Sequence, residues 1–183
     1  GSKSTAIGTD ALKSQNFTSA TDSYNVAVGF ETGQNISTGQ QNTLIGGLAG
    51  DSLTNAFYNV AIGYQALSGD TQGSKSVAIG RRSLATQNFT GGGDTYNIGI
   101  GYAAGESVTT GVNNTIMGGL AGDALTDADR NVAVGYSALS SDTLGSKSVA
   151  IGQFALATQN FTTATDTYNT AIGSNAGESV TTG

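Results

Sequence analysis

Asn59-Val60-Ala61-Ile62-Gly63-Tyr64-Gln65-Ala66-Leu67 is the stretch that decides the fold, because close relatives of it recur along the whole chain. The same short apolar run, closed by a glycine, occurs ten times in the 183 residues. We call the closing residue the marker glycine. Marker glycines stand at Gly8, Gly29, Gly46, Gly63, Gly80, Gly101, Gly118, Gly135, Gly152 and Gly173. Self-similarity of this kind is typical of repeat architectures.

The spacing of the marker glycines shows a second, longer period. Successive intervals are 21, 17, 17 and 17 residues, and this order then begins again, so that one super-repeat is 72 residues long. Whole words return at that distance, as when Ala85-Thr86-Gln87-Asn88-Phe89-Thr90 returns unchanged at 157–162. We therefore divide the chain into super-repeats 1–72 and 73–144 and a partial super-repeat 145–183, and we expect one continuous array.

The residues before each marker glycine predict a short strand. In the quoted stretch Val60 and Ile62 are large and Ala61 between them is small. Most other units keep this alternation, although Leu44 and Ile116 stand at the small position in two of them. Period-two alternation and β-branched residues indicate a strand of about 4 to 5 residues. We expect the large residues to share one face. The alanines are then expected to form a second close-packed face, because a strand facing water normally carries polar residues there.

Three further positions are constant enough to predict structural roles. Each marker glycine, such as Gly63, is expected at a turn that requires positive φ or a close backbone approach. Ala66, three residues later, belongs to a second column of small residues. Asn59 opens the strand, and every other unit has Asn or Ser there. Side chains that repeat in this way can hydrogen-bond along a stack as an amide ladder.

Units of 17 or 21 residues are too short to bury a face alone, so they must stack. We predict an all-β fold, a parallel β-solenoid of ten coils separated by about 4.8 Å. Because each coil has two apolar faces, we expect association, with a three-fold bundle hiding the inner face of every chain. The four extra residues of the longer coils are expected to form protruding loops. The loop candidates are Asn16, Phe17, Asn88, Phe89, Asn160 and Phe161.

Composition excludes several functional classes. The chain has no histidine and no cysteine, so the commonest general bases, thiol nucleophiles and metal ligands are absent, and we expect neither an enzyme nor a cofactor. Asp127-Ala128-Asp129, the densest acidic stretch, is interpreted as an exposed turn. A net charge of −6 gives no electrostatic footprint for nucleic acid. No apolar run is long enough to cross a bilayer, so this segment is not expected to insert into a membrane.

The repeated words also resemble known repeats. Ser76-Val77-Ala78-Ile79-Gly80 and 59–63 resemble the head repeats of trimeric autotransporter adhesins (YadA-like), whose units read Asn-Ser-Val-Ala-Ile-Gly followed by a small residue three positions on. Ala61-Ile62-Gly63-Tyr64-Gln65-Ala66-Leu67 is similar to repeats of bacteriophage tail-fibre proteins. This resemblance implies a left-handed parallel β-roll in a homotrimer. It also implies an extracellular location, as a cell-surface appendage or a virion fibre.

Three functions stay open at this point. The first is a structural module of an extracellular trimeric fibre that mediates or positions adhesion, with a surface glycan or a protein as its receptor. The second is a bacteriophage tail-fibre shaft. The third is a monomeric solenoid that binds a ligand along one flat face. Asn-x-Ser/Thr patterns, which are glycan acceptors in some hosts, occur at three of the expected loops, beginning at Asn16, Asn88 and Asn160.

Overall fold

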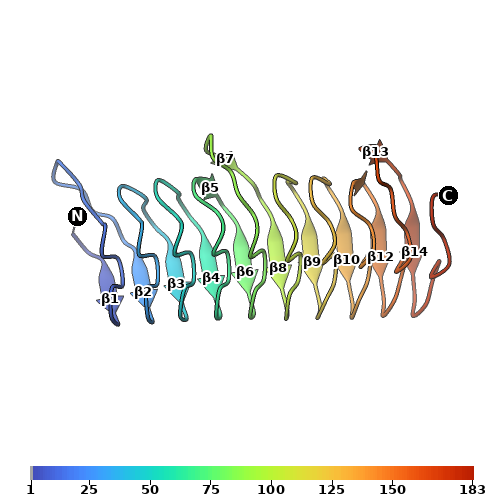
Figure 1. Cartoon of the computed structure of the whole chain (residues 1–183), viewed down its shortest axis with the longest axis horizontal. Helices are drawn as coiled ribbons and strands as arrows, with labels where there is room; N and C mark the ends of the chain where they lie inside the picture. The colour runs from blue at the N-terminus through green and yellow to red at the C-terminus, as the bar shows by residue number, and fades with distance from the viewer. Residues whose placement is uncertain (1) are drawn as a thin grey trace.

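Ten short strands, one before each marker glycine, lie side by side in a single parallel sheet (Figure 1). The computed structural model describes residues 2–183; Gly1, the first residue of super-repeat 1–72, lies outside them. The sheet order follows the chain, and the register never slips: Ala61 pairs with Leu44 on one side and with Ala78 on the other. The parallel β-solenoid of ten coils predicted from the repeats is therefore confirmed.

Each strand of the main sheet has three residues, shorter than the predicted strands. Two residues with positive φ enclose it, Tyr58 (φ 61°) before β4 and Gly63 (φ 132°) after it, and neither conformation can continue a strand. The strands are β1 (Thr5–Ile7), β2 (Val26–Val28), β3 (Thr43–Ile45), β4 (Val60–Ile62), β6 (Val77–Ile79), β8 (Ile98–Ile100), β9 (Thr115–Met117), β10 (Val132–Val134), β12 (Val149–Ile151) and β14 (Thr170–Ile172).

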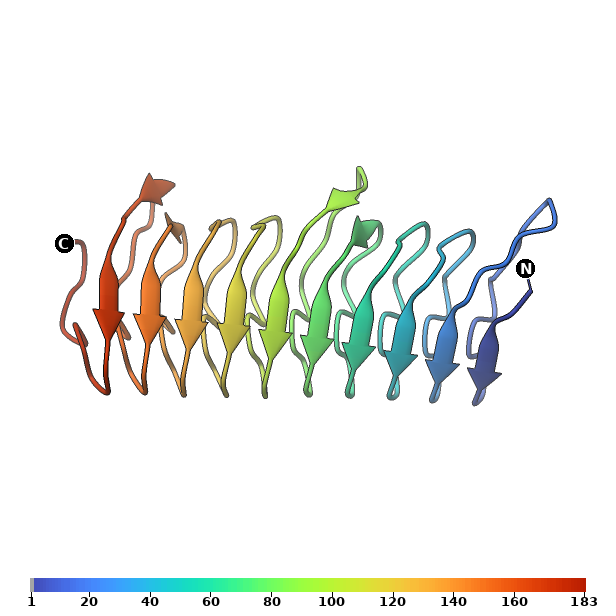
Figure 2. The ribbon, with the colours of Figure 1, turned by 180° about the vertical axis from the view of Figure 1, so that it is seen from behind.

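The coils wind in a left-handed sense. In Figure 2 the strands nearest the viewer run downward while the chain advances from right to left, and the return segments climb behind them. Two short parallel pairs brace the edge where the strands begin: β5 (Gly73–Ser74) with β7 (Gly93–Asp94), and β11 (Gly145–Ser146) with β13 (Thr165–Asp166). In both views the longer coils rise above their neighbours at this edge (Figures 1 and 2).

The alanines of the strands face the inside of the coil. Ala27, Ala61, Ala78, Ala133 and Ala150 are completely buried within the single chain. The expectation that they form a second face available for association is therefore wrong. The two walls of each coil lie too close together for a larger side chain in most units, so the strand turns its small residue inward. The β-branched residues on either side of it, such as Val60 and Ile62, point outward and are only half-buried.

Two interior positions of each coil, four and seven residues after the marker glycine, share the available volume. Where the residue four positions after the marker glycine is leucine, the residue three further on is polar, as with Leu67 and Asp70. Where it is glycine, the later residue is apolar, as with Gly50 and Leu53. A Cβ built on Gly50 would lie 2.8 Å from Leu53 Cδ1 and 3.0 Å from Leu44 Cδ2, so the glycine makes room for both leucines. Close packing of this kind leaves few voids.

Nine of the ten marker glycines combine positive φ with a close backbone approach, and Gly173 in the last coil has positive φ alone. Gly63 has φ 132°, which L residues with a side chain rarely adopt. A Cβ at that position would also lie 2.6 Å from the carbonyl oxygen of Gly80 in the next coil. Since that oxygen is backbone, it cannot move aside without disturbing the next coil, and glycine is required at this column.

The predicted amide ladder runs through the interior. Asn59 is fully buried; its Oδ1 accepts the backbone N–H of Ser76 at 2.8 Å, and its Nδ2 donates to the carbonyl of Gly73 at 2.9 Å. Asn42, Asn114 and Asn131 make equivalent contacts. Where a unit has serine in place of asparagine, as at Ser76, the shorter side chain does not reach as far as an asparagine side chain. A glutamine of the longer coil lies beside it and makes the connection. Gln87 donates to Ser76 Oγ at 2.9 Å and accepts from Asn97 Nδ2 at 2.9 Å, which closes the gap in the ladder.

Candidate functional site

The outer face of the ten-stranded sheet is an uninterrupted surface of aliphatic and threonine side chains. We call it the sheet face and define it as the first and third residues of the ten strands, which are valine, isoleucine, threonine or methionine throughout. Ile45 and Met117 expose 38% and 39% of their surface, and the other third residues between β1 and β14 are half-buried. No charged residue occurs among these positions. The sheet face therefore has the composition of a surface that is covered by something else.

Two rows of residues, which include all the tyrosines of the chain, border the sheet face. The upper row holds the residue five positions before each marker glycine: Lys3, Tyr24, Gln41, Tyr58, Lys75, Tyr96, Asn113, Arg130, Lys147 and Tyr168. The lower row holds the residue just after it: Thr9, Phe30, Gly47, Tyr64, Arg81, Tyr102, Gly119, Tyr136, Gln153 and Ser174. All seven tyrosines of the chain belong to these rows, and each exposes between 47% and 68% of its surface.

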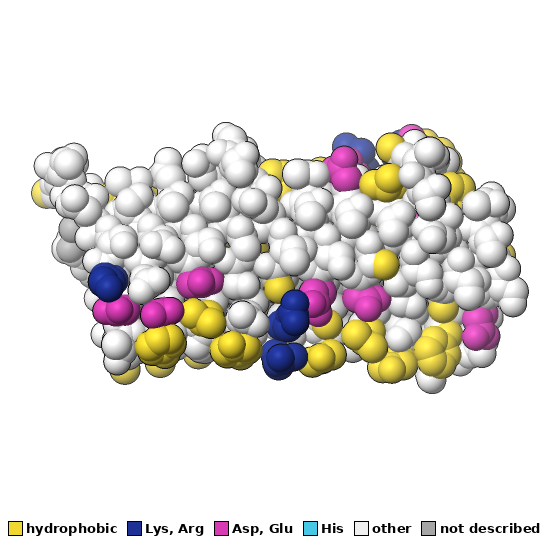
Figure 3. Space-filling model, in the orientation of Figure 1, with side chains coloured by type: hydrophobic (Ala, Val, Ile, Leu, Met, Phe, Trp, Pro, Cys, Tyr) yellow, Lys and Arg dark blue, Asp and Glu magenta, His cyan; other side chains and the backbone are white. Residues whose placement is uncertain are grey.

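The face on the opposite side of the roll is polar. In Figure 3 most of this face carries no hydrophobic side chains; those visible gather along the lower edge and at the upper right. Its threonines are engaged in binding one coil to the next: Thr54 Oγ1 donates to the carbonyl of Thr71 at 3.0 Å, and Thr126 Oγ1 donates to that of Thr143 at 3.0 Å. The two sides of the roll therefore differ in kind, since one is apolar and the other is polar and hydrogen-bonded within the chain.

A lysine, an aspartate and a tyrosine fasten each longer coil to the coil before it. Lys75 Nζ lies 2.6 Å from Asp94 Oδ2 and 3.1 Å from the hydroxyl of Tyr96, and it also lies over that ring. The hydrogen bond from Lys75 lowers the pKa of Asp94, and Asp94 in turn raises the pKa of Lys75. We call this group the clasp. It recurs as Lys3–Asp22–Tyr24 and Lys147–Asp166–Tyr168.

The predicted loop residues lie at the foot of the protruding loops, not at their tips. Asn88 is exposed and Phe89 is half-buried, and Phe89 N–H donates to Oδ1 of the buried Asp70 at 3.0 Å. The tip is formed by the residues that follow, of which 90–94 are all exposed. Asn16, Asn160, Phe17 and Phe161 occupy the same places in the other two longer coils, with the same exposure. These residues thus anchor the loops.

The other predicted positions lie inside the coil or on the sheet face. Asn59, Ala61 and Ala66 are buried, while Val60 and Ile62 belong to the sheet face. Sequence reasoning missed the two tyrosine rows. A signal for them existed, because all seven tyrosines stand at one of two fixed offsets from a marker glycine.

Several charged residues that belong to no clasp follow the marker glycines. Arg82 pairs with Glu106 at 2.6 Å, and Arg81 lies between two rings of the lower row, 5.9 Å from that of Tyr64 and 5.7 Å from that of Tyr102. Burial raises the pKa of Asp51, with a smaller contribution from the neighbouring charge of Glu31. Within residues 2–183 no three His, Cys, Asp or Glu side chains gather closely enough to hold a metal ion.

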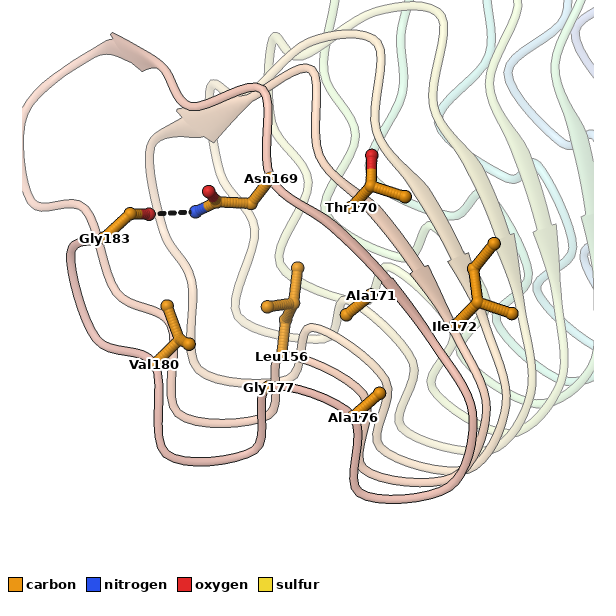
Figure 4. Close-up of a pocket in the computed structure, with 9 residues that line it drawn as sticks. All are labelled: Leu156, Asn169, Thr170, Ala171, Ile172, Ala176, Gly177, Val180 and Gly183. Carbon is orange, nitrogen blue, oxygen red and sulfur yellow. Dashed lines mark hydrogen bonds between the residues drawn. The ribbon is translucent and has the colours of Figure 1, made fainter.

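A pocket lies in the interior of the last coil, which is open at the end of the stack (Figure 4). The close-up shows Leu156, Ala171 and Val180 around a hollow that the Asn169 side chain spans to reach the Gly183 carbonyl. Elsewhere in the array the next coil covers the equivalent residues, so this pocket has no counterpart along the shaft. Among residues 2–183 no helix is present that could cross a membrane.

A comparison with protein families agrees with this geometry. Residues 144–176 match the model of the YadA head domain repeat in two copies. The matched stretch includes the marker glycines Gly152 and Gly173 and the strands β12 and β14. The resemblance to trimeric autotransporter adhesin head repeats is therefore confirmed for this part of the chain. Searches among curated proteins and among solved structures each return no match.

Proposed function

We propose that this chain is a structural repeat module of an extracellular homotrimeric fibre, and that the fibre mediates or positions adhesion to a surface or a host cell. The observation that carries the proposal is the sheet face, an apolar strip as long as the solenoid that the chain itself leaves uncovered. The match to the YadA head domain repeat supports it, since the resemblance is to adhesins that are trimeric.

The size of the strip supports burial against other copies. Ten strands spaced by about 4.8 Å make a strip roughly 48 Å long, and the seven residues from upper to lower row make it roughly 20 Å wide. The resulting area, on the order of 900 Å², is close to the roughly 800 Å² that one partner contributes to a stable protein interface. The sheet face at the centre of this strip is apolar, and exposed apolar patches larger than about a few hundred Å² mark interaction sites in soluble proteins.

A trimer would place the two sides of the roll in the surroundings that suit them. With three sheet faces turned to a common axis, the apolar residues are withdrawn from water and the polar sides form the outer surface of the rod. The protruding loops then point outward, three at each level, and recur every four coils, at roughly 19 Å. Receptor contact, with a glycan or a protein, is assigned in this proposal to that outer surface.

The proposal is tested by placing one charge on each side of the roll. Ile79→Asp adds a carboxylate in the middle of the sheet face, and Ser141→Asp, the matched control, adds one at an exposed position of the polar side. Sedimentation should show a trimer for the unmodified chain and for Ser141→Asp, and a folded monomer for Ile79→Asp. A trimer that survives Ile79→Asp would show that the sheet face is not the interface. A folded monomer of the unmodified chain would favour the solenoid that binds a ligand on its flat face.

A further inference from the structure

We infer that the upper row of one copy packs against the lower row of the next copy, coil against equal coil, and that these pairs set the register of the trimer. This inference rests on the proposed function and deepens it, since it names the residues that meet. The occupant of each edge is a second copy of this chain.

The geometry of a three-fold bundle requires the two rows to meet. When three sheet faces surround an axis that runs along the stack, all strands circulate in the same sense around it. The edge where the strands of one copy end therefore lies beside the edge where the strands of the next copy begin. A pure rotation moves nothing along the axis, so equal coils lie at equal heights.

Five of the ten coils carry related residues at their two edges. Three coils carry an aromatic ring at both edges: Tyr24 with Phe30, Tyr58 with Tyr64, and Tyr96 with Tyr102. Two coils have an amide at the upper edge and no side chain at the lower edge, Gln41 with Gly47 and Asn113 with Gly119.

Two of the five pairs repeat another pair at the 72-residue period, and the members of a pair do not contact each other within one chain. The members of each pair are six positions apart in the sequence, and the span of about 20 Å across the strand prevents contact between them. The rings are also unusually exposed: Tyr58 and Tyr64 show 52% and 47% of their surface, and Tyr96 and Tyr102 show 51% and 54%. Tyrosine is enriched at interfaces because its ring is apolar and its hydroxyl tolerates water.

Charge at the rows is consistent with this pairing. Arg130 shares a coil with Tyr136, which places a guanidinium opposite a ring across the seam. Lys75 and Arg81 share another coil and carry like charges. Lys75, however, is already neutralised by Asp94 at 2.6 Å within its own chain.

Disulfide cross-linking tests the pairs directly, because the chain has no cysteine of its own. The double variant Tyr58→Cys/Tyr64→Cys places one thiol at each edge of β4. Their separation of about 20 Å excludes a bond within one chain, since a disulfide needs Cα atoms within about 7 Å. Mild oxidation should move the denatured protein from 18.2 kDa to three times that mass. Each single variant should stay at the monomer mass, because neither position faces itself in a three-fold ring.

Two further variants complete the test. Tyr58→Cys/Tyr136→Cys puts the thiols four coils apart, roughly 19 Å along the axis, and should not cross-link. Tyr24→Cys/Phe30→Cys repeats the in-register test at another coil and covers the case in which the first pair disturbs folding. A trimer by mass that yields no covalent trimer from either in-register pair would overturn the inference and leave the proposed function standing. Equal cross-linking off register would also overturn it. The absence of any trimer would instead refute the proposed function itself.

Discussion

Replacing Asn59 by alanine tests whether the buried amide ladder stabilises the solenoid. The substitution removes the acceptor of Ser76 N–H at 2.8 Å and the donor to the Gly73 carbonyl at 2.9 Å. Ser76 and Gly73 are both buried, so water cannot replace the lost partners. Each buried polar group left without a partner costs about 1 to 3 kcal/mol. Taking about 1.5 kcal/mol, a value in the lower half of this range, for each of the two groups, we expect a loss of about 3 kcal/mol in the free energy of unfolding.

Urea denaturation followed by circular dichroism measures this loss. With a slope of about 2 kcal/mol per molar urea, the midpoint should fall by roughly 1.5 M. Asn35→Ala is the matched control, because Asn35 is exposed and its side chain makes no hydrogen bond among residues 2–183. All samples are compared at one chain concentration, since association adds to apparent stability. A midpoint for Asn59→Ala that coincides with that of Asn35→Ala would refute a stabilising role for the ladder.

Three more substitutions probe other parts of the coil. Gly63→Ala forces a Cβ to within 2.6 Å of the Gly80 carbonyl oxygen at φ 132° and should cost about 3 kcal/mol or more, whereas Gly47→Ala, with its nearest atom at 3.6 Å, should change the urea midpoint little. Leu44→Ala empties a fully buried site and should cost about 2 to 5 kcal/mol, against a smaller loss for the half-buried Leu48→Ala. Burial raises the pKa of Asp51, so its charge opposes folding; stability should fall as the pH rises through the folded-state pKa. Asp51→Asn should therefore raise the melting temperature at pH 7 and give no gain below about pH 4, and an equal gain at both pH values would contradict the burial argument.

The sequence predicts the repeat, the strands and the ladder because each depends on one chemical requirement. Only glycine fits at Gly63, and only a side chain with both a donor and an acceptor can continue the ladder at Asn59. Such positions are constant in every unit or nearly so, and constancy is visible in a single sequence with ten copies of the unit. The loops of the longer coils are predictable for the same reason, since four extra residues must leave the coil somewhere.

Which face of the strand lies inside could not be read from alternation alone. Period two shows only that Val60 and Ala61 point to opposite sides, and large residues are more often the buried ones. Here the interior of the coil is so narrow that the small Ala61 fits inside. The size of side chain that the strand can turn inward depends on Leu67 and its neighbours on the facing wall. This dependence of one side chain's size on another's involves residues from both walls of a coil. It becomes evident only when the structure shows which residues face each other.

The solution mass of the unmodified chain tests the central claim most directly. Light scattering after gel filtration should give three times 18.2 kDa, because the sheet face and its two tyrosine rows are buried only when three copies share an axis. A well-folded chain at 18.2 kDa under the same conditions would contradict the account, since the apolar sheet face would then be stable in water without a second copy to cover it.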